Sequence, residues 1–191
     1  MMDRLYRVEM AGAARYVIER SDCWYELEGD IYAGYEAGLQ LDAEEVSAAR
    51  VLPPVMPSKI VAVGLNYRDH AKEMGKTLPD EPLIFLKPST AVVGPSDAIV
   101  LPVGAGRVDH EAELGIVIGK TARQVPADCA QEYVLGLTCV NDVTDRDLQR
   151  RDVQYTRGKG FDTFAPIGPA IAVGLDGAAL DVESAVNGDL R

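Results

Sequence analysis

Long apolar runs are missing from this 191-residue sequence. No stretch approaches the ~18 apolar residues that a membrane-spanning helix needs. Cysteine is also scarce, since Cys23, Cys129 and Cys139 are widely spaced and form no C-x-x-C pair. This spacing disfavours a disulfide scaffold and a zinc ribbon. No apolar signal-peptide core follows the first residues, so we expect a soluble, cytoplasmic protein without a membrane partner.

Several enzyme motifs are absent as well. The sequence has no G-x-S-x-G elbow, which leaves a serine hydrolase unsupported. The loop 104–106 lacks the third glycine of a dinucleotide-binding loop, and 87–90 is not a phosphate loop. The two histidines do not form the closely spaced pair typical of zinc enzymes.

Positive charge is in the minority. Lys and Arg total 19 against 30 Asp and Glu, which gives a net charge of −11 at pH 7. Such a field repels nucleic acid, so we expect no nucleic-acid partner. It suits a cation-dependent enzyme, although an acidic surface also serves solubility alone.

The chain divides at its one proline cluster, residues 53–57. We predict a small N-terminal β-rich domain over 1–55 and a second domain over 57–191. Short strand-like runs in the first domain indicate a β-meander, with strands expected at 5–10, 14–19, 24–27 and 31–35.

The second part alternates short apolar runs with prolines and glycines, so the predicted fold class is α+β, mainly β. We expect strands at 59–63 (a buried strand), 83–86, 98–101, 111–118 and 134–140. Short helices are expected at 67–74, 129–132 and 145–152, the last with Thr144 as its N-cap.

An acidic pair opens the strand predicted at 111–118. Because alternate side chains share a face, Glu111 and Glu113 lie side by side, next to Gly115. The opposite face, which we expect to point into the apolar core, carries Ala112, Leu114, Ile116 and Ile118. Adjacent carboxylates repel unless a cation or a shared proton lies between them. The alternative is a solvated strand face with two acids. His110 faces away and is interpreted as a structural or outer-shell residue.

A third carboxylate, Asp142, follows the strand predicted at 134–140. Three oxygen ligands suit Mg²⁺ or Mn²⁺, which keep open positions for a substrate. We therefore predict a divalent-metal site made of Glu111, Glu113 and Asp142.

Two further signals are weaker when taken alone. His70 and Glu73 lie one helical turn apart, a spacing that lets a carboxylate orient an imidazole as general base, or makes an ordinary surface pair. Lys159 stands between two glycines, in a loop whose backbone can approach a ligand closely. It could stabilise an enolate, or it could be a flexible surface lysine.

Taken together, these residues resemble the fumarylacetoacetate hydrolase family, within its branch of acylpyruvases, fumarylpyruvate hydrolases and 2-hydroxyhepta-2,4-diene-1,7-dioate isomerases. The matching blocks keep their order over roughly 57–191. They are Gly64-Leu65-Asn66-Tyr67 with His70, Pro82 to Thr90, His110-Glu111-Ala112-Glu113-Leu114, Asn141 to Gln149, and Lys159-Gly160-Phe161-Asp162.

The resemblance implies a mixed β-sheet roll, usually dimeric, with Mg²⁺ or Mn²⁺ on the three acids. It implies His70 and Glu73 as a water-activating dyad and Lys159 as the partner of substrate or enolate. Arg146 and Gln149 resemble substrate-binding positions. The implied activity is hydrolysis of a C–C bond in acylpyruvates or other β-diketo acids.

Several alternatives stay open at this point. The same site in the family supports isomerisation of hydroxymuconates or decarboxylation of oxaloacetate, and a non-catalytic metal-binding protein is the alternative from another class. Family members continue for about a hundred further residues, so we expect that the chain, which stops within an Asn187-Gly188 hairpin, is part of a longer protein.

Overall fold

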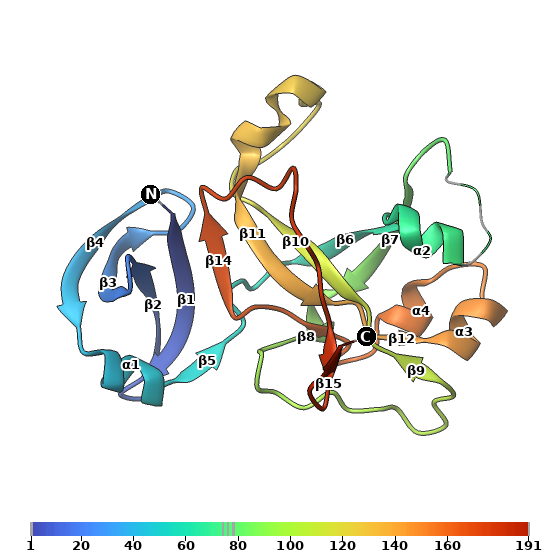
Figure 1. Ribbon diagram of the computed structural model, residues 1–191, viewed down its shortest axis with the longest axis horizontal. Coiled ribbons are helices and arrows are strands. Elements are labelled where there is room, and N and C mark those ends of the chain that lie inside the picture. Colours follow the sequence, from blue (N-terminus) through green and yellow to red (C-terminus); the bar gives the residue numbers. More distant parts are fainter. Residues whose placement is uncertain (1, 74, 76, 78, 191) are drawn as a thin grey trace.

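The computed structural model is mainly β, as the sequence predicts, and it describes residues 2–73, 75, 77 and 79–190 without the side chains of Asp69, His70 and Glu73. In this part, eight strands form one antiparallel sheet (Figure 1). Seven follow the order β10-β11-β14-β1-β2-β3-β4, and β5 pairs with β1. Their bounds are β1 (Asp3–Met10), β2 (Ala13–Arg20), β3 (Cys23–Asp30), β4 (Gly34–Leu41), β5 (Arg50–Leu52), β10 (Ala112–Ile118), β11 (Val134–Asn141) and β14 (Ala170–Val173).

Smaller pairs complete the fold and make it mixed. The pair β8 (Val92–Val93) and β13 (Ala165–Pro166) is parallel. The antiparallel pairs are β6 (Lys59–Gly64) with β7 (Leu83–Pro88), β9 (Val108–Asp109) with β12 (Thr144–Asp145), and β15 (Ala185–Val186) with β16 (Asp189–Leu190).

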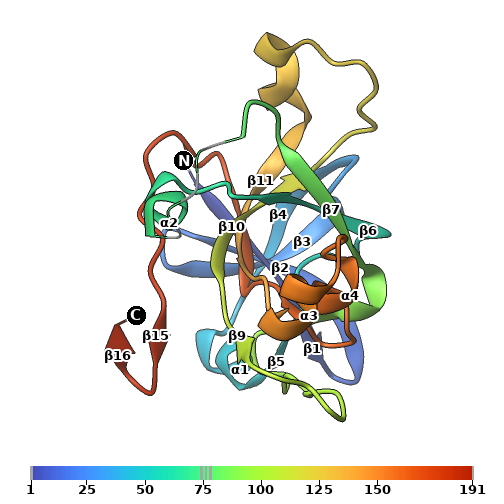
Figure 2. The ribbon, with the colours of Figure 1, turned by 90° about the vertical axis from the view of Figure 1, so that its right-hand side faces the viewer.

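Helices in the described part are short. They are α1 (Ala43–Ala48), α2 (Arg68–Glu73), α3 (Arg146–Arg151) and α4 (Thr156–Lys159), with 3-10 turns at Ser89–Ala91 and Ala127–Tyr133. Figure 2 shows α3 and α4 together below the β6–β7 hairpin. None of these helices is long and apolar enough to cross a membrane.

The N-terminal meander confirms three of the four predicted strands. The fourth, expected at 31–35, begins later, at Gly34. The reason is the Asp30 carboxylate, whose Oδ1 accepts hydrogen bonds from the backbone N–H groups of Tyr32 and Ala33. This side chain therefore builds the turn at 31–33.

The meander shares its sheet with the second half of the chain, because β1 pairs with β14. Leu5 stands opposite Ile171, and both are fully buried. They belong to one apolar cluster with Ile18 and Val117. The predicted division at 53–57 stays a prediction, with the two sides joined by a common sheet and core.

The β6–β7 hairpin corrects one expectation. The run 59–63 forms a strand, but it is not fully buried, since Val61 and Val63 are exposed. Their partners across the hairpin are Leu86 and Ile84, which are exposed as well. One face of this two-stranded sheet is covered, and it carries Phe85 and Lys87 of β7 together with Ile60 of β6, which packs against the apolar core.

The strand expected at 98–101 is absent from the structure. The backbone N–H of Val100 donates to Thr163 Oγ1 at 2.8 Å instead of joining a ladder. Ile99, Val100 and Leu101 remain exposed. The strand predicted from the apolar run 98–101 was therefore wrong.

Candidate active site

The three predicted metal ligands come together at one end of the β10–β11 pair. Ala112 of β10 stands opposite Asn141 of β11, so the residues next to them meet. The backbone N–H of Asp142 donates to the Glu111 carbonyl at 2.9 Å. Carboxylate oxygens of Glu111, Glu113 and Asp142 lie within 4.8 Å of one another.

The face assignment of β10 was wrong at its C-terminal end. Val117, which shares its face with Glu113, is buried, whereas Ile116 and Ile118 are more than half exposed. The acidic face of β10 therefore continues into the apolar core. His110 precedes the strand and is exposed, with Nε2 3.5 Å from Ser184 Oγ.

Lys159 is a buried cation that contacts two of the three acids. It ends helix α4 rather than lying in a loop, and it is only 3% exposed. Its Nζ donates to Glu111 Oε2 (2.8 Å), Asp142 Oδ2 (2.5 Å) and Thr144 Oγ1 (2.7 Å). The ammonium also lies 5.1 Å from the centroid of the Phe85 ring. The interpretation as a flexible surface lysine is therefore excluded.

A second buried lysine, Lys87 of β7, was missed as a site residue. Its Nζ donates to Asp142 Oδ1 at 2.5 Å and to the Phe164 carbonyl at 2.7 Å. Burial lowers the pKa of Lys87, and the neighbouring Asp142 carboxylate opposes this shift. The only signal in the sequence was a lysine at an inward position of an otherwise apolar strand.

Each oxygen of Asp142 is thus held by a different ammonium group. Fixing both oxygens sets the orientation of the carboxylate before any ligand arrives. Thr144 reinforces this arrangement, because its hydroxyl donates to the Asp142 carbonyl while accepting from Lys159. Thr144 is therefore not the N-cap of α3.

The N-cap of α3 is Asp145, whose Oδ1 accepts from the backbone N–H groups of Asp147 and Leu148 at 3.0 Å. Arg146 is the first residue of α3 after this cap. Its guanidinium contacts Asp109 (2.8 Å), Glu111 (2.5 Å) and the Gln149 side-chain oxygen (3.0 Å).

The side chains of His70 and Glu73 lie outside the described residues. The backbone of α2 spans both positions, so the expected helix is confirmed there. Their assignment as a water-activating dyad stays a prediction.

These groups surround a cavity of about 970 Å³. Glu111, Glu113, Asp142, Arg146, Gln149 and Lys159 all line it, together with Tyr67, Phe85 and Asp109, to which the sequence analysis assigned no role in the site.

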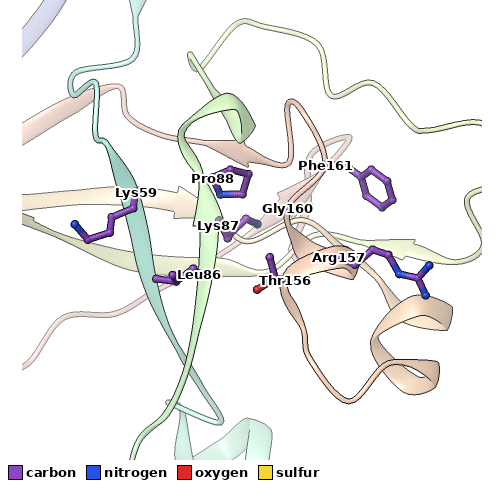
Figure 3. Close-up of a pocket in the computed structure, with 8 residues that line it drawn as sticks. All are labelled: Lys59, Leu86, Lys87, Pro88, Thr156, Arg157, Gly160 and Phe161. Carbon is purple, nitrogen blue, oxygen red and sulfur yellow. The ribbon is translucent and has the colours of Figure 1, made fainter.

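A second hollow of about 430 Å³ lies between β7 and α4 (Figure 3). Its lining is mostly apolar. In Figure 3 the two charged side chains at its ends, Lys59 and Arg157, extend away from each other. It therefore offers no convergent charge.

The donor set of the large cavity fits a divalent cation. Three hard oxygen ligands are typical of Mg²⁺ and Mn²⁺ sites. The pKa of Glu113 is raised to about 7, first by burial and then by the negative charges of Asp142 and Glu111. A cation between the three acids would relieve this repulsion.

The raised pKa of Glu113 predicts a pH dependence for cation binding. Below about pH 7 the carboxyl holds a proton that a cation must displace. We expect Mn²⁺ affinity to increase by up to about tenfold per pH unit below that value and to level off above it. Isothermal titration from about pH 5 to about pH 8 measures this. An affinity independent of pH would contradict the assignment.

A protein-family model and several known proteins match this chain. The family model described as fumarylacetoacetate (FAA) hydrolase C-terminal matches residues 59–191. An uncharacterized protein of Archaeoglobus fulgidus is 51% identical over 86% of this chain and 64% of its own length. The mitochondrial oxaloacetate tautomerase Fahd2a of Rattus norvegicus is 42% identical over 72% of this chain and 45% of its own.

Among solved structures, a 5-carboxymethyl-2-hydroxymuconate delta-isomerase from Mycobacterium smegmatis has a TM-score of 0.87 and 39% identity. The match covers 98% of this chain and 74% of that one. The chain spans 64% of the length of the Archaeoglobus fulgidus relative, which is less than two thirds. On the family match and these identities, the chain belongs to the fumarylacetoacetate hydrolase family.

Proposed function

We propose that the site acts on 2-oxo acids by moving a proton on the carbon next to the oxo group, as an isomerase or tautomerase. The observation that carries this proposal is Lys159, a buried ammonium at the cavity wall between two carboxylates. Removing a proton beside a 2-oxo group creates an enolate, and an enolate needs fixed positive charge. A pre-positioned lysine supplies that charge without reorganisation.

The other residues have roles that follow from their positions. Arg146 and Gln149 face the cavity and are placed to hold the substrate carboxylate. Lys87 and Thr144 keep Asp142 and Lys159 in place. A divalent cation on the three acids would supply Lewis-acid polarisation of the substrate oxygens. Mg²⁺ and Mn²⁺ both suit this donor set.

The named relatives support proton transfer. One is an isomerase of a hydroxymuconate and the other a tautomerase of oxaloacetate, and neither name implies C–C cleavage. The activity is a proposal for the whole protein, because the chain covers only part of these relatives. A homodimer in the cytoplasm remains part of the same proposal.

Hydrolysis is the second candidate, and a sequence observation favours it. His70 and Glu73 lie one turn apart on α2, where Glu73 could orient His70 to activate water against the distal carbonyl of an acylpyruvate. Cleavage would then leave pyruvate and a second acid.

Nuclear magnetic resonance of the protein with Mg²⁺ and several 2-oxo acids tests the proposal. The panel contains acylpyruvates, oxaloacetate and a hydroxymuconate. A shifted double bond, or faster keto–enol exchange of oxaloacetate, is the expected result. Pyruvate with a second acid would establish hydrolase activity instead, and pyruvate with CO₂ a decarboxylase. No change with metal bound would indicate a binding protein.

A further inference from the structure

Tyr67 is tied to the strand that carries Glu113. It lies between β6 and α2, where its carbonyl accepts from the Ala71 backbone N–H at 3.1 Å and so begins the helix. Its side-chain hydroxyl accepts from the backbone N–H of Leu114 at 3.0 Å. That N–H belongs to the peptide bond that joins Glu113 to Leu114 on β10.

In this contact the Tyr67 oxygen is the acceptor, so the hydroxyl can still donate a hydrogen bond of its own. The oxygen is used as an acceptor by Leu114, and no described residue accepts a hydrogen bond from the Tyr67 O–H. The residue is half-buried and lines the large cavity with Glu113 and Lys159. A donor whose oxygen already accepts a hydrogen bond is polarised, which strengthens its own donation.

We propose that Tyr67 is a substrate-binding residue, whose O–H donates a hydrogen bond to a carboxylate or enolate oxygen of the 2-oxo acid in the cavity. The Leu114 amide fixes the phenol oxygen, so little rotational freedom is lost when the ligand binds. This inference rests on the proposed function, since it names a contact to the same class of substrate.

A purely structural role is the competing explanation. Tyr67 could serve only to anchor the start of α2 to β10, and its neighbour Asn66 reinforces that connection, because Asn66 Nδ2 lies 3.4 Å from Glu113 Oε1. If anchoring were the only role, losing the hydroxyl would disturb Glu113 and cation binding together with ligand binding.

Tyr67→Phe separates the two roles, with oxalate as the probe because its planar dianion resembles a 2-oxo acid enolate. The control is Tyr133→Phe, outside the cavity. We expect Tyr67→Phe to weaken oxalate binding to the Mn²⁺-loaded protein by about ten- to a hundredfold. Its Mn²⁺ affinity should stay within about twofold of wild type, as should both affinities of the control.

Two results would overturn the proposal: unchanged oxalate affinity, or a parallel loss of Mn²⁺ affinity. A tyrosine ultraviolet difference spectrum of the wild-type protein on adding oxalate is the second measurement. It needs no variant to fold, and a flat spectrum also overturns the contact. A wild-type protein that binds oxalate through Tyr67 but converts no 2-oxo acid refutes the proposed function alone.

Discussion

Glu113→Gln abolishes the response to divalent cations while stabilising the cation-free protein. The amide keeps the shape of the side chain but removes a negative charge that Asp142 and Glu111 repel. We expect Mn²⁺ affinity to fall more than about 100-fold, since even partners outside the ligand shell are worth 10–100-fold. Turnover should drop by roughly a thousandfold, the equivalent of several kcal/mol of transition-state stabilisation.

The stability change has a sign that depends on pH. Burial raises the pKa of Glu113 to about 7, so its ionised form is disfavoured in the folded state above that value. Without a cation at pH 8, the variant should melt roughly 2–4 °C above wild type. The gain should shrink as pH falls from about 7 toward the ordinary glutamate value of 4.5. A lower melting temperature for Glu113→Gln in cation-free buffer at every pH would show that Glu113 is not repelled.

Replacement of Lys159 by Met removes the charge that the proposed enolate requires. Turnover should fall by about 10²–10³-fold, the usual loss for one pre-positioned donor at a developing anion. The fold should lose about 3 kcal/mol as well, since the change breaks a buried ion pair that joins Glu111 and Asp142. Steady-state kinetics well below the melting temperature, together with urea unfolding, separate the two effects.

Lys87→Met is the matched control for this variant. Lys87 is equally buried and also bonds Asp142, yet it is not among the residues that line the large cavity. We expect a similar loss of stability but a smaller loss of turnover. Equal losses of turnover in both variants would mean that the two lysines act only by balancing the charge of Asp142.

The three acids Glu111, Glu113 and Asp142 could be predicted because each stands at a recognisable place in or after a predicted strand. Glu111 and Glu113 are two residues apart, which places them on one face of any strand. Asp142 follows an apolar run that forms the partner strand β11, so pairing brings it to the same end. Strand periodicity predicted the wrong covered face at the end of β10, because the cover comes from distant strands: Val117 packs in one cluster with Leu5 and Ile171.

Lys87 could not be predicted as a site residue from the sequence. Its partner Asp142 lies 55 positions away, and the one local signal, a lysine within an apolar strand, does not say which acid the lysine contacts. The prediction of Thr144 as the N-cap of α3 was wrong for a related reason. Lys159, which comes from a later helix, engages the Thr144 hydroxyl and leaves Asp145 to cap α3.

The pairing of β1 has a consequence for synthesis of the chain. One edge of this strand is divided, since Arg7 to Glu9 pair with β5 and Asp3 to Tyr6 pair with β14. The first partner is translated soon after β1, but β14 follows by roughly 160 residues, or about 10–30 s at ordinary ribosomal rates. The half of this edge formed by Asp3 to Tyr6 therefore has no partner strand until β14 has been translated. Neighbouring nascent chains on one messenger would meet at this edge first, so slow elongation before β14 should favour their co-translational misassembly.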